Sequence, residues 1–63
     1  METAFESKMR QLTDDEIIEM MDRTWDDPEG EIFREYGLDI IQERCGEDYS
    51  DSVYVILWNK HRR

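Results

Sequence analysis

The stretch Val53-Tyr54-Val55-Ile56-Leu57-Trp58 is the longest uninterrupted apolar run in this sequence. It is also the only run that is dense in β-branched and aromatic residues, which favour strands. As a strand it would need cover on both faces, because alternate side chains point to opposite sides and all of them are apolar. A single strand also carries unpaired backbone groups along both edges. The run therefore predicts a C-terminal strand that needs a partner.

The segment Thr13-Asp14-Asp15-Glu16 carries the signature of a helix start. Thr13 can accept hydrogen bonds from the first free amides, and Glu16 can reach back to the Thr13 N–H group as in a capping box. Apolar residues then recur at helical spacing as far as Trp25. The sequence therefore predicts a helix from Asp14 to about Trp25.

A second helix is expected to start at Pro28, a residue that suits the first helical position, and to run through Tyr36. Gly37 leaves two alternatives open. Either it stops this helix, so that a third one covers residues 40–45, or one helix passes through it at a cost of about 1 kcal/mol. We prefer two short helices, and Gly46 is expected to end the segment in both cases.

These elements predict a single small domain over residues 1–63, with flexible ends at 1–11 and 59–63. Its fold class is α+β and mostly helical, with two to three short helices followed by one C-terminal strand. The alternative is an all-α helical mini-bundle, in which Ser52 caps a last helix that runs through Asn59; the β-branched density favours the strand. The predicted core consists of Ile17, Ile18, Met21, Trp25, Phe33, Tyr36, Ile41, Val55 and Leu57.

The charge balance restricts the partners. The chain holds 17 acidic residues against 8 lysines and arginines, a net charge of −9. Such a field repels nucleic acid and anionic membranes and attracts basic surfaces. No apolar run approaches the roughly 20 residues that a membrane span needs, no signal-peptide core is visible, and a single cysteine suits a reducing compartment. We therefore expect a cytoplasmic protein without a membrane partner or direct nucleic-acid binding.

Residues able to support catalysis are few. Cys45 lies on the apolar side of a predicted helix, and His61 lies in a basic tail where nothing would orient it as a base. The acidic residues around Gly30 partly match a calcium-binding EF-hand loop, but Trp25 and Tyr36 fall at its first and last ligand positions. We therefore expect a protein that is not an enzyme, with no catalytic residue, no metal and no cofactor.

One segment, residues 32–39, resembles the second helix and turn of a helix-turn-helix DNA-binding motif. The resemblance ends there, because Ile40 and Ile41 fall where that motif exposes its base-reading side chains. Glu43 falls where the motif needs a core aliphatic residue. The sequence therefore does not favour DNA binding.

An acidic face is the first predicted interaction surface. Carboxylates on successive turns of a helix lie about 5–6 Å apart, comparable to the phosphates along a nucleic-acid strand. By analogy of size and charge with small acidic DNA mimics and inhibitors, which are often virus-encoded, this face is expected to dock on a basic protein surface, such as a nucleic-acid-binding groove. Its residues are Asp14, Asp15, Glu19, Asp22, Asp26, Glu31, Glu35, Asp39 and Glu43.

The strand 53–58 is the second predicted interaction surface. It is expected to pair with its own copy in a homodimer, or to extend a partner's sheet. The predicted function is a non-enzymatic protein-binding regulator or inhibitor. The alternative is a structural or oligomerisation module whose acidity serves only solubility.

Overall fold

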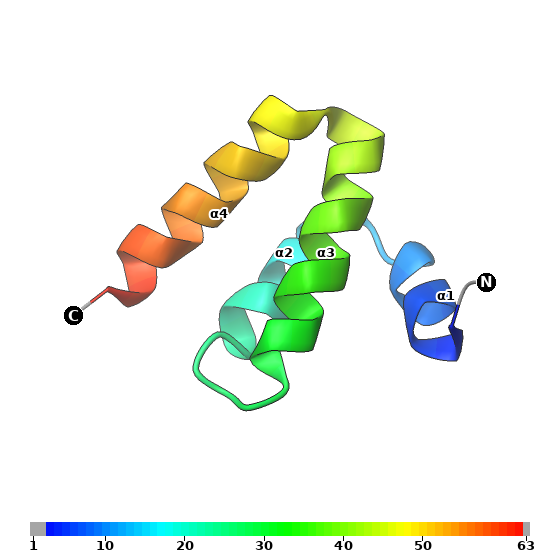
Figure 1. Ribbon diagram of the computed structural model, residues 1–63, viewed down its shortest axis with the longest axis horizontal. Coiled ribbons are helices and arrows are strands. Elements are labelled where there is room, and N and C mark those ends of the chain that lie inside the picture. The colour runs from blue at the N-terminus through cyan, green and yellow to red at the C-terminus, as the bar shows by residue number, and fades with distance from the viewer. Residues whose placement is uncertain (1–2, 63) are drawn as a thin grey trace.

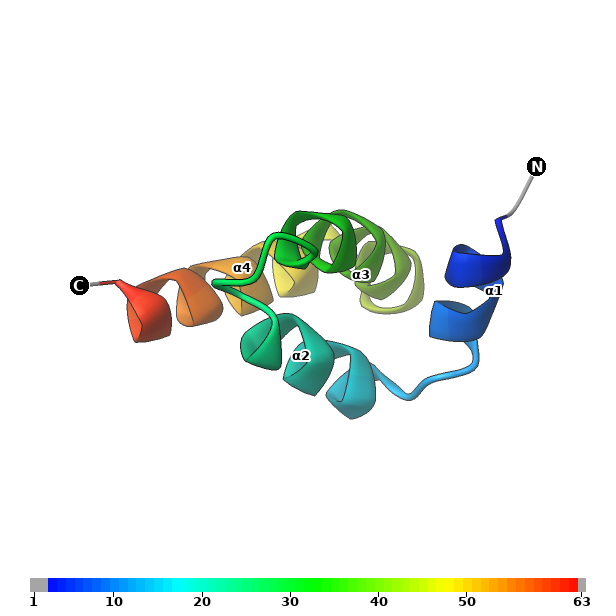
Figure 2. The same ribbon diagram turned by 90° about the horizontal axis from the view of Figure 1, so that it is seen from below.

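The computed structural model describes residues 3–62, which form four helices joined by short connections (Figure 1). They are α1 (Ala4–Arg10), α2 (Asp14–Arg23), α3 (Gly30–Cys45) and α4 (Glu47–His61). Helix α3 is central, because each of the other three helices packs against it. Figure 2 shows α3 and α4 in one layer, with α2 beneath them and α1 to one side. The molecule is flat, with extents of 37 × 26 × 17 Å.

The predicted C-terminal strand is wrong. Residues 53–58 lie inside α4, and residues 3–62 contain no strand, so the all-α mini-bundle replaces the α+β class. The buried residues Ser50, Val53 and Leu57 follow a helical period and face α3. A lone strand would leave its backbone N–H and C=O groups unpaired, whereas a helix pairs them internally. Packing on α3 therefore overrides the β propensity of residues 53–58. The predicted homodimer through a C-terminal strand cannot form in this way, because residues 3–62 contain no strand.

Helix α4 also starts earlier than the all-α alternative expects. It begins at Glu47 rather than after Ser52 and extends past Asn59 to His61. The preceding Gly46, which was expected to end the helical segment, does so: it separates α3 from α4 with a φ of 96° and a ψ of 163°. This conformation is almost restricted to glycine.

Helix α2 begins as predicted. The Thr13 hydroxyl accepts a hydrogen bond from Glu16 N at 3.2 Å, and Thr13 N donates to the Glu16 carboxylate at 2.9 Å. Both halves of the capping box are therefore formed. The helix ends at Arg23, two residues before the predicted end, and the Thr24 hydroxyl donates to the carbonyl of Met20 at 2.8 Å.

The preferred division of residues 28–45 into two short helices is wrong. Helix α3 starts at Gly30 and continues through Gly37 to Cys45. Gly37 lies against α2, where a Cβ atom would stand 2.9 Å from Met21 Sδ and 3.1 Å from Ile17 Cγ2. The glycine thus allows α2 and α3 to approach closely and does not break the helix.

The core lies between α3 and the other helices. Four of the predicted core residues are buried, and Ile18, Trp25, Phe33 and Tyr36 pack half-buried around them. Val55 is 53% exposed, because it lies on the side of α4 away from α3. The buried apolar residues are Met9, Ile17, Met21, Ile40, Ile41, Val53 and Leu57.

The stretch predicted as a flexible N-terminal end contains helix α1. Thr3 caps it by accepting a hydrogen bond from Glu6 N at 3.0 Å, and Met9 enters the core. Residues 1–2 and 63, the outermost parts of the two predicted flexible ends, lie outside the described residues. Within residues 3–62, no helix has both the length and the apolar character that crossing a membrane requires.

Candidate protein-interaction surfaces

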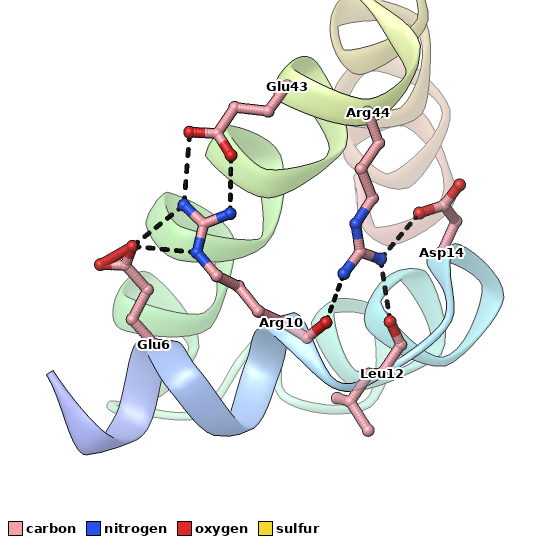
Figure 3. Close-up of polar contacts among 6 residues, drawn as sticks. All are labelled: Glu6, Arg10, Leu12, Asp14, Glu43 and Arg44. Atoms are coloured by element: carbon pink, nitrogen blue, oxygen red, sulfur yellow. Dashed lines mark hydrogen bonds and ion pairs between the residues drawn. The ribbon is translucent and has the colours of Figure 1, made fainter. Parts of the chain in front are cut away.

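Arg10 ties α1 to α3 (Figure 3). Its guanidinium donates to both carboxylate oxygens of Glu43, at 2.7 and 3.3 Å, and to Glu6 at 3.1 and 3.3 Å. The hydrogen bond from Arg10 lowers the pKa of the Glu43 carboxyl. Glu43, one of the predicted partner-binding residues, is thus paired within the chain.

Arg44 holds the connection between α1 and α2 against the end of α3 (Figure 3). It donates to the carbonyls of Arg10 and Leu12, at 2.6 and 2.8 Å, and to the Asp14 carboxylate at 3.1 Å. The hydrogen bond from Arg44 is the main cause of a lowered pKa of Asp14. Asp14 therefore also has a cation partner within the chain.

Cys45 is exposed, and its Sγ lies 3.2 Å from an oxygen of Asp14. The hydrogen bond to this carboxylate raises the pKa of the thiol, and desolvation adds to the effect. Because the thiolate is the reactive form, the environment disfavours a nucleophilic role for Cys45.

A second cluster joins the end of α4 to α2. Asp22 accepts hydrogen bonds from Lys60 Nζ and His61 Nε2, both at 2.5 Å. The hydrogen bond from Lys60, followed by that from His61, lowers the pKa of Asp22. The His61 ring also stacks on Trp25, with centroids 5.4 Å apart, and its Nδ1 lies 4.0 Å from the Asp26 carboxylate. Asp22 therefore faces Lys60 and His61 of α4, and Asp26 faces His61.

Four of the seven lysines and arginines in residues 3–62 contact groups of the chain itself. Arg34 donates to the Trp25 carbonyl at 2.8 Å, and its guanidinium carbon lies 4.9 Å from the centroid of the Trp25 ring. Together with Arg10, Arg44 and Lys60, it contacts groups of the chain itself. The exposed cations of residues 3–62 that have no such contact are Lys8, Arg23 and Arg62.

The remaining predicted carboxylates form two exposed stripes. The α3 stripe consists of Glu31, Glu35 and Asp39, and the α2 stripe consists of Asp15 and Glu19; within the described residues none of the five has an ion pair. In each stripe the residues follow one another at intervals of four, so they lie on one side of their helix. The stripes are the part of the predicted acidic face that is open to a partner.

The two stripes point in opposite directions. Asp15 and Glu19 each lie two residues from Ile17, and two residues in a helix correspond to a rotation of about 160°. Glu35 and Asp39 each lie two residues from Gly37, and Gly37 faces Ile17 across the contact between α2 and α3. The structure therefore does not bring all predicted acidic residues onto one surface, and a partner would meet either the α2 stripe or the α3 stripe.

The apolar stretch 53–58 is divided between core and solvent. Val53 and Leu57 are buried, and the other four side chains are exposed. Among the described residues, α4 holds five of the six exposed large hydrophobic residues, with Ile32 of α3 as the sixth. The five on α4 are Tyr49, Tyr54, Val55, Ile56 and Trp58.

Residues 3–62 contain no group of three or more His, Cys, Asp or Glu side chains that could hold a metal ion. Comparisons of the chain with protein-family models, with curated proteins and with solved structures find no significant match.

Proposed function

We propose that the protein is a non-enzymatic regulator or inhibitor that binds a basic protein surface through the α3 stripe. The observation that carries this proposal is the unequal use of charge. Arg10, Arg44 and Lys60 pair with acidic groups within the chain, whereas Glu31, Glu35 and Asp39 are exposed and have no cation partner in the described residues. Three cations of the chain are thus paired with its own acidic groups, while the carboxylates of the α3 stripe remain open to a partner.

The α3 stripe is better suited to this role than the α2 stripe. Its three carboxylates extend over more than two turns of the longest helix, at a rise of about 6 Å for every four residues. A row of charges on a rigid helix loses little entropy on binding and can match a row of cations that otherwise contacts phosphates. A nucleic-acid-binding groove of a cytoplasmic partner is the kind of surface that fits.

The proposal can be tested with immobilised protein and a cell lysate at two salt concentrations. We expect basic, nucleic-acid-handling proteins to be retained at low salt, to be released at moderate salt, and to be displaced by added double-stranded DNA. Electrostatic binding weakens in this way because salt screens exposed charges. Retention that is insensitive to salt would contradict the proposal.

A matched pair of variants locates the surface. The triple substitution Glu31→Gln, Glu35→Gln and Asp39→Asn removes the charges of the α3 stripe while keeping the shapes of the side chains. The double substitution Asp15→Asn and Glu19→Gln does the same for the α2 stripe. We expect only the triple variant to lose the retained proteins. If neither variant loses them, the acidity serves solubility and the stripes have no part in binding.

A further inference from the structure

Helix α4 is apolar on more sides than one packed face requires. Val53 and Leu57 bury one side against α3, yet Val55 is 53% exposed and Ile56 is 64% exposed on the remaining surface. Large apolar side chains that gather on an exposed surface often mark a site of interaction with another protein. Figure 1 shows α4 at the edge of the fold, where it diverges from α3 beyond the turn that joins the two helices. The outer side of α4 therefore combines charged residues with exposed apolar ones, among them Val55 and Ile56, that have no cover in the single chain.

The outer side of α4 has a symmetric spacing of residues. Its exposed residues are Asp48, Asp51, Val55 and Asn59 of α4 and Arg62, the residue that directly follows the helix. They are separated by three, four, four and three positions, which keeps them along one side of the helix and its C-cap. All five are exposed. Val55 is the midpoint, so the order of the residues reverses about it. We call this row the α4 outer row.

The charges of the α4 outer row are opposite at its two ends. Asp48 and Asp51 lie before Val55, and Arg62 lies after it. None of these three side chains has a hydrogen bond or ion pair within the described chain. The row is thus complementary to its own reversed copy: when two copies run antiparallel about Val55, Asp48 of each faces Arg62 of the other. A parallel pair would instead place like charges together.

We propose that the protein forms a homodimer in which two α4 helices pack antiparallel about a twofold axis at Val55. In this arrangement Val55 meets its counterpart at the axis, and Asp51 faces Asn59. Asp51, Ser52, Val55 and Ile56 line a shallow hollow on the helix surface, into which an apolar side chain of the second copy fits as a knob into a hole. Trp58 and Ile56 flank the axis on either side and lose their exposure.

The occupant is a second copy because the outer row itself supplies the complementary charge. A purely acidic or purely basic partner would match only one end of the row. The antiparallel arrangement also sets the two helix dipoles in opposite directions, which is favourable. The net charge of −9 opposes association at low salt, so the dimer is best measured at about 0.15 M salt, where exposed charges are screened beyond about 8 Å.

The first test is the mass of the full chain by sedimentation equilibrium. One pair of α4 helices, each of 15 residues, makes a small interface, so we expect a dissociation constant in the micromolar range. The mass should rise from that of one chain towards that of two between about 1 µM and about 1 mM. A single-chain mass throughout this range overturns the proposal.

Two lysine substitutions test the position of the interface. Val55→Lys places like charges at the axis and should leave a single-chain mass at every concentration. Ile32→Lys changes the exposed hydrophobic residue outside α4 in the same way and should leave the dimer intact. Circular dichroism checks that each variant is folded, and Val55→Ser provides a milder change at the same position. A dimer that survives both folded Val55 variants, or that Ile32→Lys abolishes, places the interface elsewhere and overturns the proposal.

Charge reversal tests the antiparallel orientation. Asp48→Arg should weaken the dimer by roughly tenfold, because two equivalent ion pairs become repulsive. Asp39→Arg, which changes the net charge equally on α3, should not weaken it. The double substitution Asp48→Arg and Arg62→Asp should restore the affinity. If the double variant stays as weak as Asp48→Arg, the antiparallel register is wrong. These results leave the proposed binding of a basic partner untouched, because the α3 stripe is unchanged in the Val55 and Asp48 variants.

Discussion

Gly37 of α3 faces Met21 of α2 so closely that a Cβ atom at position 37 would stand 2.9 Å from the Met21 sulfur. The same Cβ atom would lie 3.1 Å from Ile17 Cγ2, and both Met21 and Ile17 are fully buried. The contact between α2 and α3 is thus set by the absence of a side chain. It also fixes the directions of the two acidic stripes, because the stripes lie on the opposite sides of these two helices.

Gly37→Ala is therefore expected to destabilise the fold although alanine is the better helix former. Alanine gains about 1 kcal/mol in helix propensity, and overpacking a filled core costs about 1–3 kcal/mol. We expect a net loss of about 1 kcal/mol in the free energy of unfolding, measured by urea denaturation followed by circular dichroism. Gln42→Ala, at an exposed position of the same helix, should change stability by less than about 0.5 kcal/mol.

The double substitution Gly37→Ala and Met21→Ala separates crowding from other causes. Met21→Ala alone leaves a cavity, and the methyl group at position 37 partly fills it. The loss in the double variant should therefore be smaller than the sum of the two single losses. A strictly additive loss would show that the two residues do not crowd one another.

The helix start at Thr13 could be predicted from the sequence because its signals lie within one turn. The cap depends on Thr13 and Glu16 alone, and both of its hydrogen bonds are present. Gly46 could be predicted for the same reason. Gly37 was ambiguous, because a glycine that ends a helix and a glycine that admits a neighbouring helix look the same in the sequence.

The conformation of residues 53–58 could not be predicted from their own composition. A β-rich run forms a strand only where another strand pairs with it, and no strand is available in residues 3–62. The expectation that Val55 is buried failed for the same reason, because the helical period turns it away from α3 while Val53 and Leu57 face the core.

The pairing of the charged residues was equally hidden. Glu43 and Arg10 are 33 positions apart, and Asp14 and Arg44 are 30 apart. Nothing local indicates which carboxylates of the predicted acidic face find a cation in the folded chain. The candidate site is therefore smaller than the predicted acidic face. Asp14 pairs with Arg44 of α3, Asp22 contacts the end of α4, and Glu43 pairs with Arg10 of α1.

Arg44→Lys should destabilise the protein although the charge is kept. Arg44 bridges the carbonyls of Arg10 and Leu12 and the Asp14 carboxylate, and a single ammonium group cannot reproduce this planar fork. We expect a loss of about 1–2 kcal/mol in the free energy of unfolding, since hydrogen bonds from charged donors are among the stronger ones. Thermal unfolding followed by circular dichroism measures it.

Arg23→Lys provides the matched control for Arg44→Lys. Arg23 is exposed on α2 and has no hydrogen bond or ion pair within the described residues. Its replacement should be neutral within about 0.5 kcal/mol. Equal losses in the two variants would mean that the bridge from Arg44 does not hold the connection between α1 and α2 in solution.

Gly46→Ala should be destabilising without any steric overlap. A Cβ at this position meets nothing within 4 Å, but the backbone has a φ of 96° and a ψ of 163°. This region costs a residue with a side chain about 1–3 kcal/mol. Chemical denaturation of the variant should show a loss of this size.

Gly46→Asn tests whether the link between α3 and α4 has an extended ψ or the ψ of an ordinary left-handed cap. Asparagine tolerates the left-handed helical region, where ψ is near 47°, but not an extended ψ at positive φ. Asparagine should therefore be no better than alanine at position 46. A variant as stable as the parent protein would indicate that the link between α3 and α4 adopts an ordinary left-handed cap in solution.

The contact of Asp22 with Lys60 and His61 predicts a pH dependence of stability. These partners lower the pKa of Asp22 in the folded protein below its ordinary value of 3.8. A lowered pKa stabilises the folded state when the pH is above the unfolded value, and this stabilisation is lost as the pH falls through the folded pKa. Asp22→Asn should therefore unfold more easily than the parent protein at pH 7, by about 0.5–1 kcal/mol for a partly exposed ion pair.

The difference between Asp22→Asn and the parent protein should shrink once the pH falls below the ordinary value of 3.8 and vanish when Asp22 is protonated in both states. Urea denaturation followed by tryptophan fluorescence between neutral and acidic pH measures this, because Trp25 stacks on His61 beside the contact. Asp39→Asn removes a carboxylate that has no cation partner in the described residues and should show no such trend. If the two variants respond to pH alike, the contact of Asp22 with the end of α4 does not stabilise the fold.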